Sequence, residues 1–308
     1  VTGVQTCPLP ICIRWIFALK PALEQRFNGY TSTKRNYKES QINTNKYSKI
    51  EFIDQNPIGK SSRSNPITYI KAYDEIRSLF SSQKLSKSRE YKSGFFSFNV
   101  DGGRCDNCKG EGETTVEMQF MADVHLLCDE CKGNRFKDEI LEIKFSGKNI
   151  SDILDLTVDE ALTFFTKNGE ERINKKIQPL QDVGLGYVKL GQSSSTLSGG
   201  EAQRIKLASF LGKGENSEKI IFIFDEPTTG LHFHDINKLL TSFNELIKKG
   251  HSVICIEHNL DVIKCADWII DLGPEGGDKG GKIVFEGTPE ELIKNKISFT
   301  SKYLKKKL

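Results

Sequence analysis

The sequence has no stretch of 18 or more uncharged apolar residues, which is about the length that a membrane-spanning helix requires. Its most apolar early stretch, Ile11 to Leu19, is short and is interrupted by Arg14. It also has little net charge, because 44 basic residues face 41 acidic ones, which gives +3 at pH 7. We therefore expect a cytoplasmic protein with no membrane partner, and the whole-chain charge identifies no other partner.

The sequence has no secretory signal pattern to accompany its eight cysteines, so it does not favour a disulfide framework. Cys7, Cys12, Cys255 and Cys265 have no metal-binding spacing, and we interpret them as incidental or buried thiols. The other four cysteines are grouped.

Regular patterns are absent at the start of the chain and strong toward its end. Residues 1–13 have neither helical nor strand periodicity, and we expect them to be foreign to the domain that follows. After residue 178, short apolar runs at 220–224 and 252–256 alternate with helical patterns. This alternation predicts an α/β fold with a parallel sheet and helices on both of its sides.

Cys105, Cys108, Cys128 and Cys131 form two Cys-x-x-Cys pairs with nineteen residues between them. This spacing is typical of a closed tetrahedral zinc site with four thiolate ligands. We predict a structural Zn²⁺ that orders a glycine-rich insertion, with a contribution on the order of 10 kcal/mol. The alternatives are four core cysteines or two redox pairs, although a redox dithiol would come singly, at a strand-to-helix junction.

A Leu-Ser-Gly-Gly-Glu motif at 197–201 opens a predicted helix and is similar to the signature of the ATP-binding-cassette family. The glycines let backbone N–H groups approach a γ-phosphate, and the helix N-terminus adds a partial positive charge. The predicted nucleotide-binding residues of this motif are Ser198, Gly199, Gly200 and Glu201.

The apolar run at 220–224 ends in two carboxylates, Asp225 and Glu226, which is a Walker B pattern. Asp225 can hold Mg²⁺ through water, and Glu226 can orient and polarise the attacking water. The alternative is an Asp-Glu pair that caps the next helix. One strand later His258 occupies the place where the cassette family keeps a histidine on the γ-phosphate. Gln55 resembles that family's Q-loop glutamine, which contacts Mg²⁺ and the attacking water.

No segment of the chain matches the phosphate-binding loop Gly-x-x-x-x-Gly-Lys-Ser/Thr. The single Gly-Lys-Ser sequence, at 59–61, has Asp54 at the position of the first glycine and is followed by no helix start. Cassette ATPases bind ATP between this loop and Walker B of one domain and the signature of another. The chain would then supply half of each site, and we expect it to be inactive as an ATPase on its own.

Five segments together resemble the UvrA family of the bacterial excinuclease system: 55–69, 94–105, 197–208, 225–232 and 256–263. The resemblance covers about residues 14–304. It implies the second ATPase domain of that family, in a chain that begins after the phosphate-binding loop. The implied division is a non-family segment 1–13, the N-terminal part of the ATPase domain at 14–93, a zinc insertion at 94–137, and the remainder of the ATPase domain at 138–308.

The family functions in nucleotide excision repair. The resemblance therefore implies ATP and Mg²⁺ as ligands of the intact protein, a UvrA homodimer, and damaged double-stranded DNA as its target. It also implies UvrB, which the dimer loads at the lesion, and UvrC, which acts afterwards.

A local excess of positive charge supports a DNA partner. Residues 60–109 contain ten Lys or Arg against five Asp or Glu, although a solvated basic face would give the same count. We predict phosphate contacts from Lys60, Arg63, Arg104, Lys109, Lys132 and Arg135. Phe96 and Phe98 alternate as in a strand, which favours core packing over stacking on bases.

Other classes explain only part of these motifs. A transporter ATPase would share the signature, Walker B and histidine, but we would not expect it to carry four cysteines between the Q-loop and the signature. A DnaJ-like zinc chaperone would repeat its cysteine unit and would have no Walker B. A chromosome-associated ATPase would need long heptad segments, which the sequence lacks.

Overall fold

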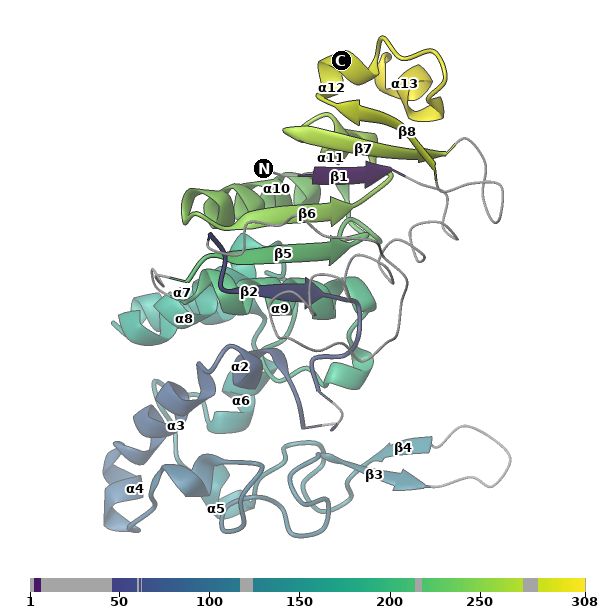
Figure 1. Ribbon diagram of the computed structural model, residues 1–308. Coiled ribbons are helices and arrows are strands. Elements are labelled where there is room, and N and C mark those ends of the chain that lie inside the picture. The colour runs from purple at the N-terminus through teal and green to yellow at the C-terminus, as the bar shows by residue number, and fades with distance from the viewer. Residues whose placement is uncertain are drawn as a thin grey trace. The chain divides into compact units, whose positions relative to one another are not determined.

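The structure is a computed structural model that describes residues 3–6, 46–59, 61, 63–116, 124–213, 218–273 and 282–307. Contacts within the chain divide it into two units, each with its own fold (Figure 1). Unit 1 consists of Val1–Gln55 and Lys213–Leu308, and unit 2 is Asn56–Gly212. The boundaries predicted at residues 13, 93 and 137 follow a family resemblance rather than contacts, and they stay a prediction.

Unit 1 is built on a six-stranded sheet with the order β2-β5-β6-β1-β7-β8 (Figure 1). The strands are β1 Gly3–Thr6, β2 Lys49–Ile53, β5 Ile220–Asp225, β6 Ser252–Ile256, β7 Trp268–Gly273 and β8 Lys282–Gly287. All neighbours pair in parallel except β7 and β8, which are antiparallel. The predicted α/β fold with a parallel sheet is confirmed. Central parallel strands are covered on both faces, which is why β5 is an unbroken apolar run.

Strand β1 lies in the segment 1–13, whose sequence shows no strand periodicity. Gly3–Thr6 pair with β6 on one side and β7 on the other, and the expectation that the segment is foreign to the domain stays a prediction. Four residues are too few to show a periodicity, so backbone pairing defines this strand rather than its side-chain pattern. The other residues of the segment 1–13 lie outside the described residues.

Among the described residues of unit 1, the helices are α10 Phe233–Lys248, α11 Leu260–Ile263, α12 Pro289–Leu292 and α13 Phe299–Leu304. Helix α10 packs on β6 through an apolar face, where Leu239, Phe243 and Leu246 are buried. It stops before Gly250, whose φ of +87° suits the residue that ends a helix. In the described part of the chain, no helix is both long and apolar enough to cross a membrane.

Unit 2 consists of short helices and one hairpin. Its helices are α2 Pro66–Tyr69, α3 Tyr73–Ser81, α4 Lys84–Ser88, α5 Asp138–Leu141, α6 Ile150–Asp155, α7 Val158–Lys167, α8 Glu171–Asp182 and α9 Gly199–Leu211. The part of unit 2 that the structure describes also contains the 3₁₀ helices η1 Ser93–Phe96 and η2 Ser194–Thr196 and the strands β3 Glu113–Val116 and β4 Val124–Leu127. Helix α8 packs against both α7 and α9.

Phe96 and Phe98 are fully buried, so the predicted core packing is confirmed. The reason given for it was wrong, because Phe96 ends the 3₁₀ helix η1 and does not lie in a strand. Tyr73 of α3 stacks on Phe98 with ring centres 4.9 Å apart, and its hydroxyl donates to the Phe96 carbonyl. The aromatic cluster thus fixes the segment that leads into the first cysteine pair.

Candidate zinc centre and nucleotide site

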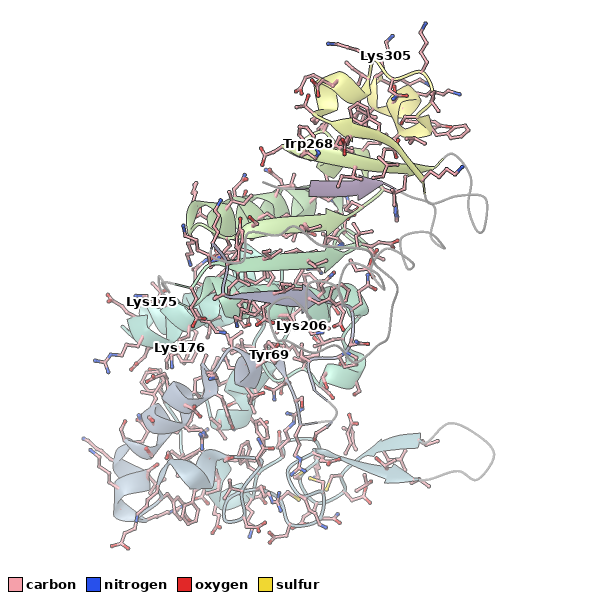
Figure 2. The ribbon with its side chains drawn as sticks, in the orientation of Figure 1. Tyr69, Lys175, Lys176, Lys206, Trp268 and Lys305 are labelled. Atoms are coloured by element: carbon pink, nitrogen blue, oxygen red, sulfur yellow. The ribbon has the colours of Figure 1, made fainter. Side chains whose placement is uncertain are left out.

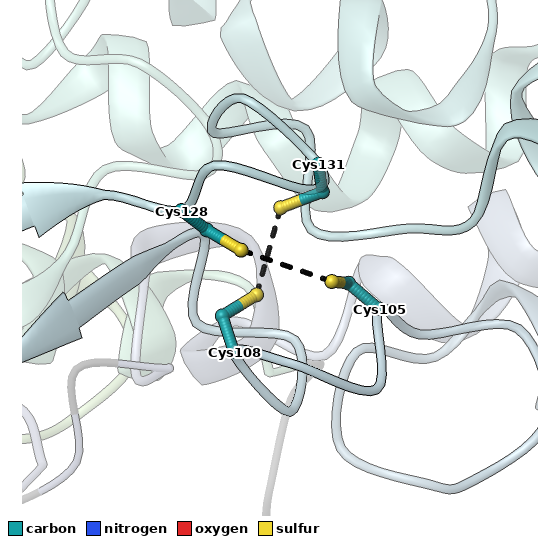
Figure 3. A group of neighbouring side chains, drawn as sticks. All are labelled: Cys105, Cys108, Cys128 and Cys131. Atoms are coloured by element: carbon teal, nitrogen blue, oxygen red, sulfur yellow. Dashed lines mark hydrogen bonds between the residues drawn. The ribbon is translucent and has the colours of Figure 1, made fainter.

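The four predicted zinc ligands meet in unit 2. Cys105, Cys108, Cys128 and Cys131 point toward one another from two loops (Figure 3), and their sulfur atoms all lie within 4.8 Å. The Sγ atoms of Cys105 and Cys128 are 3.9 Å apart, and those of Cys108 and Cys131 are 3.5 Å apart. A tetrahedron with Zn–S bonds of about 2.3 Å requires S–S distances of about 3.8 Å, whereas a disulfide requires about 2.05 Å. The geometry therefore fits a tetrahedral metal site.

The two loops repeat one backbone design. Each has the sequence Cys-Asp-x-Cys-Lys-Gly, and in each the lysine and the glycine adopt the left-handed conformation. The φ values are +51° and +84° at Lys109 and Gly110, and +49° and +89° at Lys132 and Gly133. This turn folds each pair of cysteines around one point, which is how a zinc knuckle presents two sulfurs to one ion.

Nearby N–H groups and burial act on the four sulfurs in opposite directions, because N–H groups favour the thiolate and burial disfavours it. The backbone N–H of Gly112 donates to Cys108 Sγ at 3.3 Å, and the Asn107 amide donates to Cys128 Sγ at 3.5 Å. Burial raises the pKa of Cys105 to about 12. At Cys128 burial acts in the same direction, but hydrogen bonds with the backbone N–H groups of Cys131 and Glu130 and with the thiols of Cys131 and Cys105 together lower the pKa to about 7. Four buried sulfur atoms with N–H groups beside them form a set of ligands for a soft cation such as Zn²⁺.

The predicted Walker B residues lie in unit 1, at the carboxyl end of β5. Glu226 follows the strand with a φ of +46°, and its N–H donates to the Ile256 carbonyl of β6 at 2.9 Å. The Gln55 amide lies 3.5 Å from the carbonyl oxygens of both Asp225 and Glu226. His258 Nδ1 is 3.7 Å from a Glu226 carboxylate oxygen. The structure thus brings together the four residues that the sequence placed on one nucleotide edge.

Glu257 also belongs to this edge, although no role for it is predicted from the sequence. Its side chain is 1% exposed. One carboxylate oxygen accepts from the N–H and the hydroxyl of Thr228, and the other accepts from the N–H groups of His258 and Asn259. Glu257 therefore fixes the loop after β5 and the residues after β6 to each other. Its position directly before His258 is the feature of the sequence that could have pointed to it.

Burial and the neighbouring carboxylates raise the affinity of Asp225 for a proton. Burial raises the pKa of Asp225, and the negative charges of Glu226, Asp54 and Glu257 raise it further. A divalent cation would relieve this repulsion. Because hard carboxylate oxygens are ligands that Mg²⁺ accepts, the donor set fits Mg²⁺ better than a soft metal.

The predicted signature residues lie in unit 2, at the start of α9. Ser198 caps the helix: its hydroxyl accepts from the Glu201 N–H, and a Glu201 carboxylate oxygen accepts from the Ser198 N–H at 2.8 Å. Gly199 and Gly200 form the first turn. The Tyr187 hydroxyl donates to the other Glu201 oxygen at 2.8 Å, and so holds the capping carboxylate in place. Tyr187 is not predicted from the sequence, because only the fold brings it to the motif.

The residues predicted to contact DNA differ in how exposed their side chains are and in whether they already have a partner. Lys60 lies outside the described residues. Arg104 is paired with Asp101 and its side chain is 14% exposed, Arg63 lies 3.8 Å from Glu111, and Arg135 donates to the Gly191 carbonyl. Lys109 and Lys132 are exposed, and neither forms an ion pair within the described part of the chain. These two lysines are the most accessible cations on the zinc-bearing loops.

The fold and the two sites define the class of protein. The chain is a mixed α/β protein with a carboxylate-terminated parallel strand typical of ABC ATPases, and it carries a cluster of four cysteines that could hold a metal ion. The chain is 56% identical over 260 residues to UvrABC system protein A of Aquifex aeolicus, a match that covers 84% of this chain and 28% of that protein. Against the Clostridium acetobutylicum protein of the same name it is 53% identical over 288 residues, with coverages of 91% and 30%.

The similarity extends to three dimensions. A crystal structure of UvrA2 from Deinococcus radiodurans matches with a TM-score of 0.87 and 40% identity, covering 99% of this chain and 36% of that one. No family model matches the chain. The chain is a homologue of UvrA over most of its length, and it spans between 28% and 36% of the length of these three relatives.

Proposed function

We propose that the chain is the zinc-bearing second ATPase domain of a UvrA-type protein that recognises DNA damage in nucleotide excision repair. The observation that carries this proposal is the presence, in one UvrA homologue, of both the four-thiolate cluster and the carboxylate edge around Glu226. In the intact protein the partners would be damaged double-stranded DNA, a second copy of UvrA, and UvrB, with UvrC acting after them.

In the nucleotide site, Mg²⁺ would supply charge neutralisation for the phosphates of ATP. Asp225 would hold the ion through water. Glu226 would orient the attacking water, with His258 beside it and Gln55 closing the site over the strand end. The signature turn at Ser198 would serve a second domain's nucleotide. Because the chain contains no phosphate-binding loop, it would not hydrolyse ATP on its own.

In unit 2, the four cysteines would hold one structural Zn²⁺, which would supply folding free energy and no catalysis. The metal would fix the turns that present Lys109 and Lys132, so that both ammonium groups can reach DNA phosphates. Phosphate contacts position a protein without reading sequence, as a sensor of varied damage requires.

The test combines metal analysis with DNA binding. We expect one zinc per chain and salt-sensitive binding to duplex DNA, measured by fluorescence anisotropy with and without a bulky adduct. The double variant K109Q/K132Q should reduce the slope of log affinity against log salt by about 1.8, since each phosphate contact contributes about 0.9. The matched control is K167Q/K175Q, which neutralises two exposed lysines of α7 and α8.

An unchanged slope in K109Q/K132Q, or an equal change in the control, would remove these lysines from the DNA surface. A chain without zinc would refute the assignment of the four cysteines. Binding that does not depend on the adduct would leave a DNA-binding domain and would argue against damage recognition by this chain.

A further inference from the structure

The last part of unit 1 presents a basic and aromatic surface that none of the sites above uses. Between residues 294 and 307 the sequence has six lysines and no acidic residue. Three large apolar side chains of this segment are exposed, Ile297 by 68%, Phe299 by 58% and Tyr303 by 61%. We call this surface the tail patch; it consists of Ile297, Phe299, Lys302, Tyr303, Lys305 and Lys306.

Hydrogen bonds and packing fix one side of α13 (Phe299–Leu304) to strand β7. The Ser298 hydroxyl caps α13 by accepting from the Ser301 N–H at 3.0 Å, and it donates to the buried carboxylate of Asp271 on β7. The Thr300 hydroxyl donates to the other oxygen of Asp271 at 3.2 Å, and Leu304 is fully buried. Because one side of the helix is fixed to the sheet in this way, the opposite side is presented in a defined orientation.

The exposed side chains of α13 share one face. Phe299, Lys302 and Tyr303 are three and four residues apart, and the Lys302 ammonium lies 4.9 Å from the centre of the Phe299 ring. Lys305 (Figure 2) and Lys306 follow, both exposed and without an ion pair in the described part of the chain. Lys307 differs, because it pairs with Asp261 at 2.7 Å. The patch therefore combines two exposed aromatic rings with three unpaired cations.

These features favour one kind of partner. Lysine is depleted in the cores of protein–protein interfaces, so three unpaired lysines do not favour a protein partner. Lysine ammonium groups bind phosphates as point charges, and exposed aromatic rings stack on bases that are not paired in a duplex. We propose that the tail patch binds single-stranded nucleic acid, with phosphates at Lys302, Lys305 and Lys306 and bases against Phe299 and Tyr303. This contact does not rest on the proposed repair function.

The first test removes the two rings. The zinc-loaded chain with F299A/Y303A should bind a labelled oligothymidine of about 20 nucleotides at least about fivefold more weakly, because each stacked base contributes about 1 kcal/mol or more. Binding to a duplex of the same length should change less than about twofold, because its bases are already stacked. Both side chains are exposed, so thermal unfolding should be nearly unchanged, which separates lost binding from lost folding.

The second test removes charge alone. K305Q/K306Q should reduce the salt slope for the single strand by about 1.4, since each contact contributes about 0.7. K167Q/K175Q, with the same loss of charge on α7 and α8, should leave that slope unchanged; Lys175 is labelled in Figure 2.

The proposal is overturned if F299A/Y303A binds the oligothymidine as the unaltered chain does. It is also overturned if these variants lose affinity only for vesicles that contain phosphatidylserine, which would make the patch a membrane contact. The zinc-bearing loops are tested separately by K109Q/K132Q on duplex DNA. A failure there refutes the DNA surface of unit 2 and leaves the tail patch standing.

Discussion

Asp225 is a residue whose charge costs folding free energy. Burial, together with the negative charges of Glu226, Asp54 and Glu257, raises its pKa above the ordinary 3.8. A carboxyl group whose folded pKa is raised binds its proton more tightly in the folded state than in the unfolded state. Stability is therefore lost as the pH rises from the unfolded pKa through the raised folded pKa, and the full cost is present above it.

We therefore expect D225N to make the chain more stable at pH 7, since the amide has no charge to repel. The difference should shrink as the pH is lowered through the raised pKa of Asp225, because the carboxyl group of the unaltered chain then takes up its proton. Urea unfolding across this pH range measures the difference. The control D155N, at an exposed carboxylate paired with Lys189 at 3.4 Å, should change stability by less than about 1 kcal/mol. A D225N chain that is less stable at pH 7 would show that the carboxylate is stabilising.

Unlike Asp225, Glu257 should stabilise the fold, because both oxygens of its carboxylate accept hydrogen bonds. Each of its two oxygens accepts two hydrogen bonds. E257Q replaces one oxygen by an N–H₂ group, which faces two donors and leaves them without an acceptor. We expect a loss of about 1–3 kcal/mol per abandoned donor in urea unfolding. E286Q, on the exposed side of β8, is the control and should be neutral; equal losses in both would contradict the assignment.

At the scale of the element, the two cysteine loops share one backbone conformation but differ in the space around their glycines. Gly110 has a φ of +84°, and a Cβ there would lie 2.2 Å from the Phe98 carbonyl oxygen. Gly133 has a φ of +89°, but its Cβ would meet only the Leu127 side chain, at 3.3 Å. The first loop is therefore packed directly on backbone, and the second is adjacent to a side chain that can move.

The substitutions G110A and G133A test this difference. G133A should cost about 1–3 kcal/mol, the penalty of the left-handed conformation alone. G110A adds a backbone clash, so we expect a larger loss and a chain that releases zinc to a chelator at lower chelator concentration. Chelator titration followed by metal analysis provides the readout. If the two variants retain zinc equally, the close approach to Phe98 has no role in the site.

The features that could be predicted from the sequence are those set by a pattern within one short segment. Strand β5 is a continuous apolar run, α10 has a helical apolar face, and the cysteine spacing is that of a metal site. The sequence does not predict what depends on distant pairing. Strand β1 is defined by neighbours on both sides, and Tyr187 reaches Glu201 only through the fold. The order of Gln55, Glu226 and His258 along the chain predicted a shared site because parallel strands end at one edge of a sheet.

At the scale of the whole molecule, the four clustered cysteines and the six-stranded sheet belong to different units. The segment that carries the cysteines is closed by backbone hydrogen bonds from Cys105 to Arg135 and from Lys137 to Gly103, at 2.9 and 3.0 Å. All four thiols lie within that segment, in unit 2, whereas β5 and β6 belong to unit 1. A metal that contributes on the order of 10 kcal/mol should therefore stabilise one part of the chain far more than the other.

Removal of zinc by a chelator should accordingly raise amide hydrogen exchange in residues 103–137, including the hairpin β3–β4, and leave β5 and β6 protected. Adding Zn²⁺ should restore the protection, whereas Mg²⁺ should not, because thiolates are poor ligands for a hard cation. Hydrogen exchange followed by mass spectrometry resolves both regions in one experiment. If β5 and β6 lose protection together with the cysteine loops, the chain unfolds as one cooperative body and the metal supports the nucleotide edge as well.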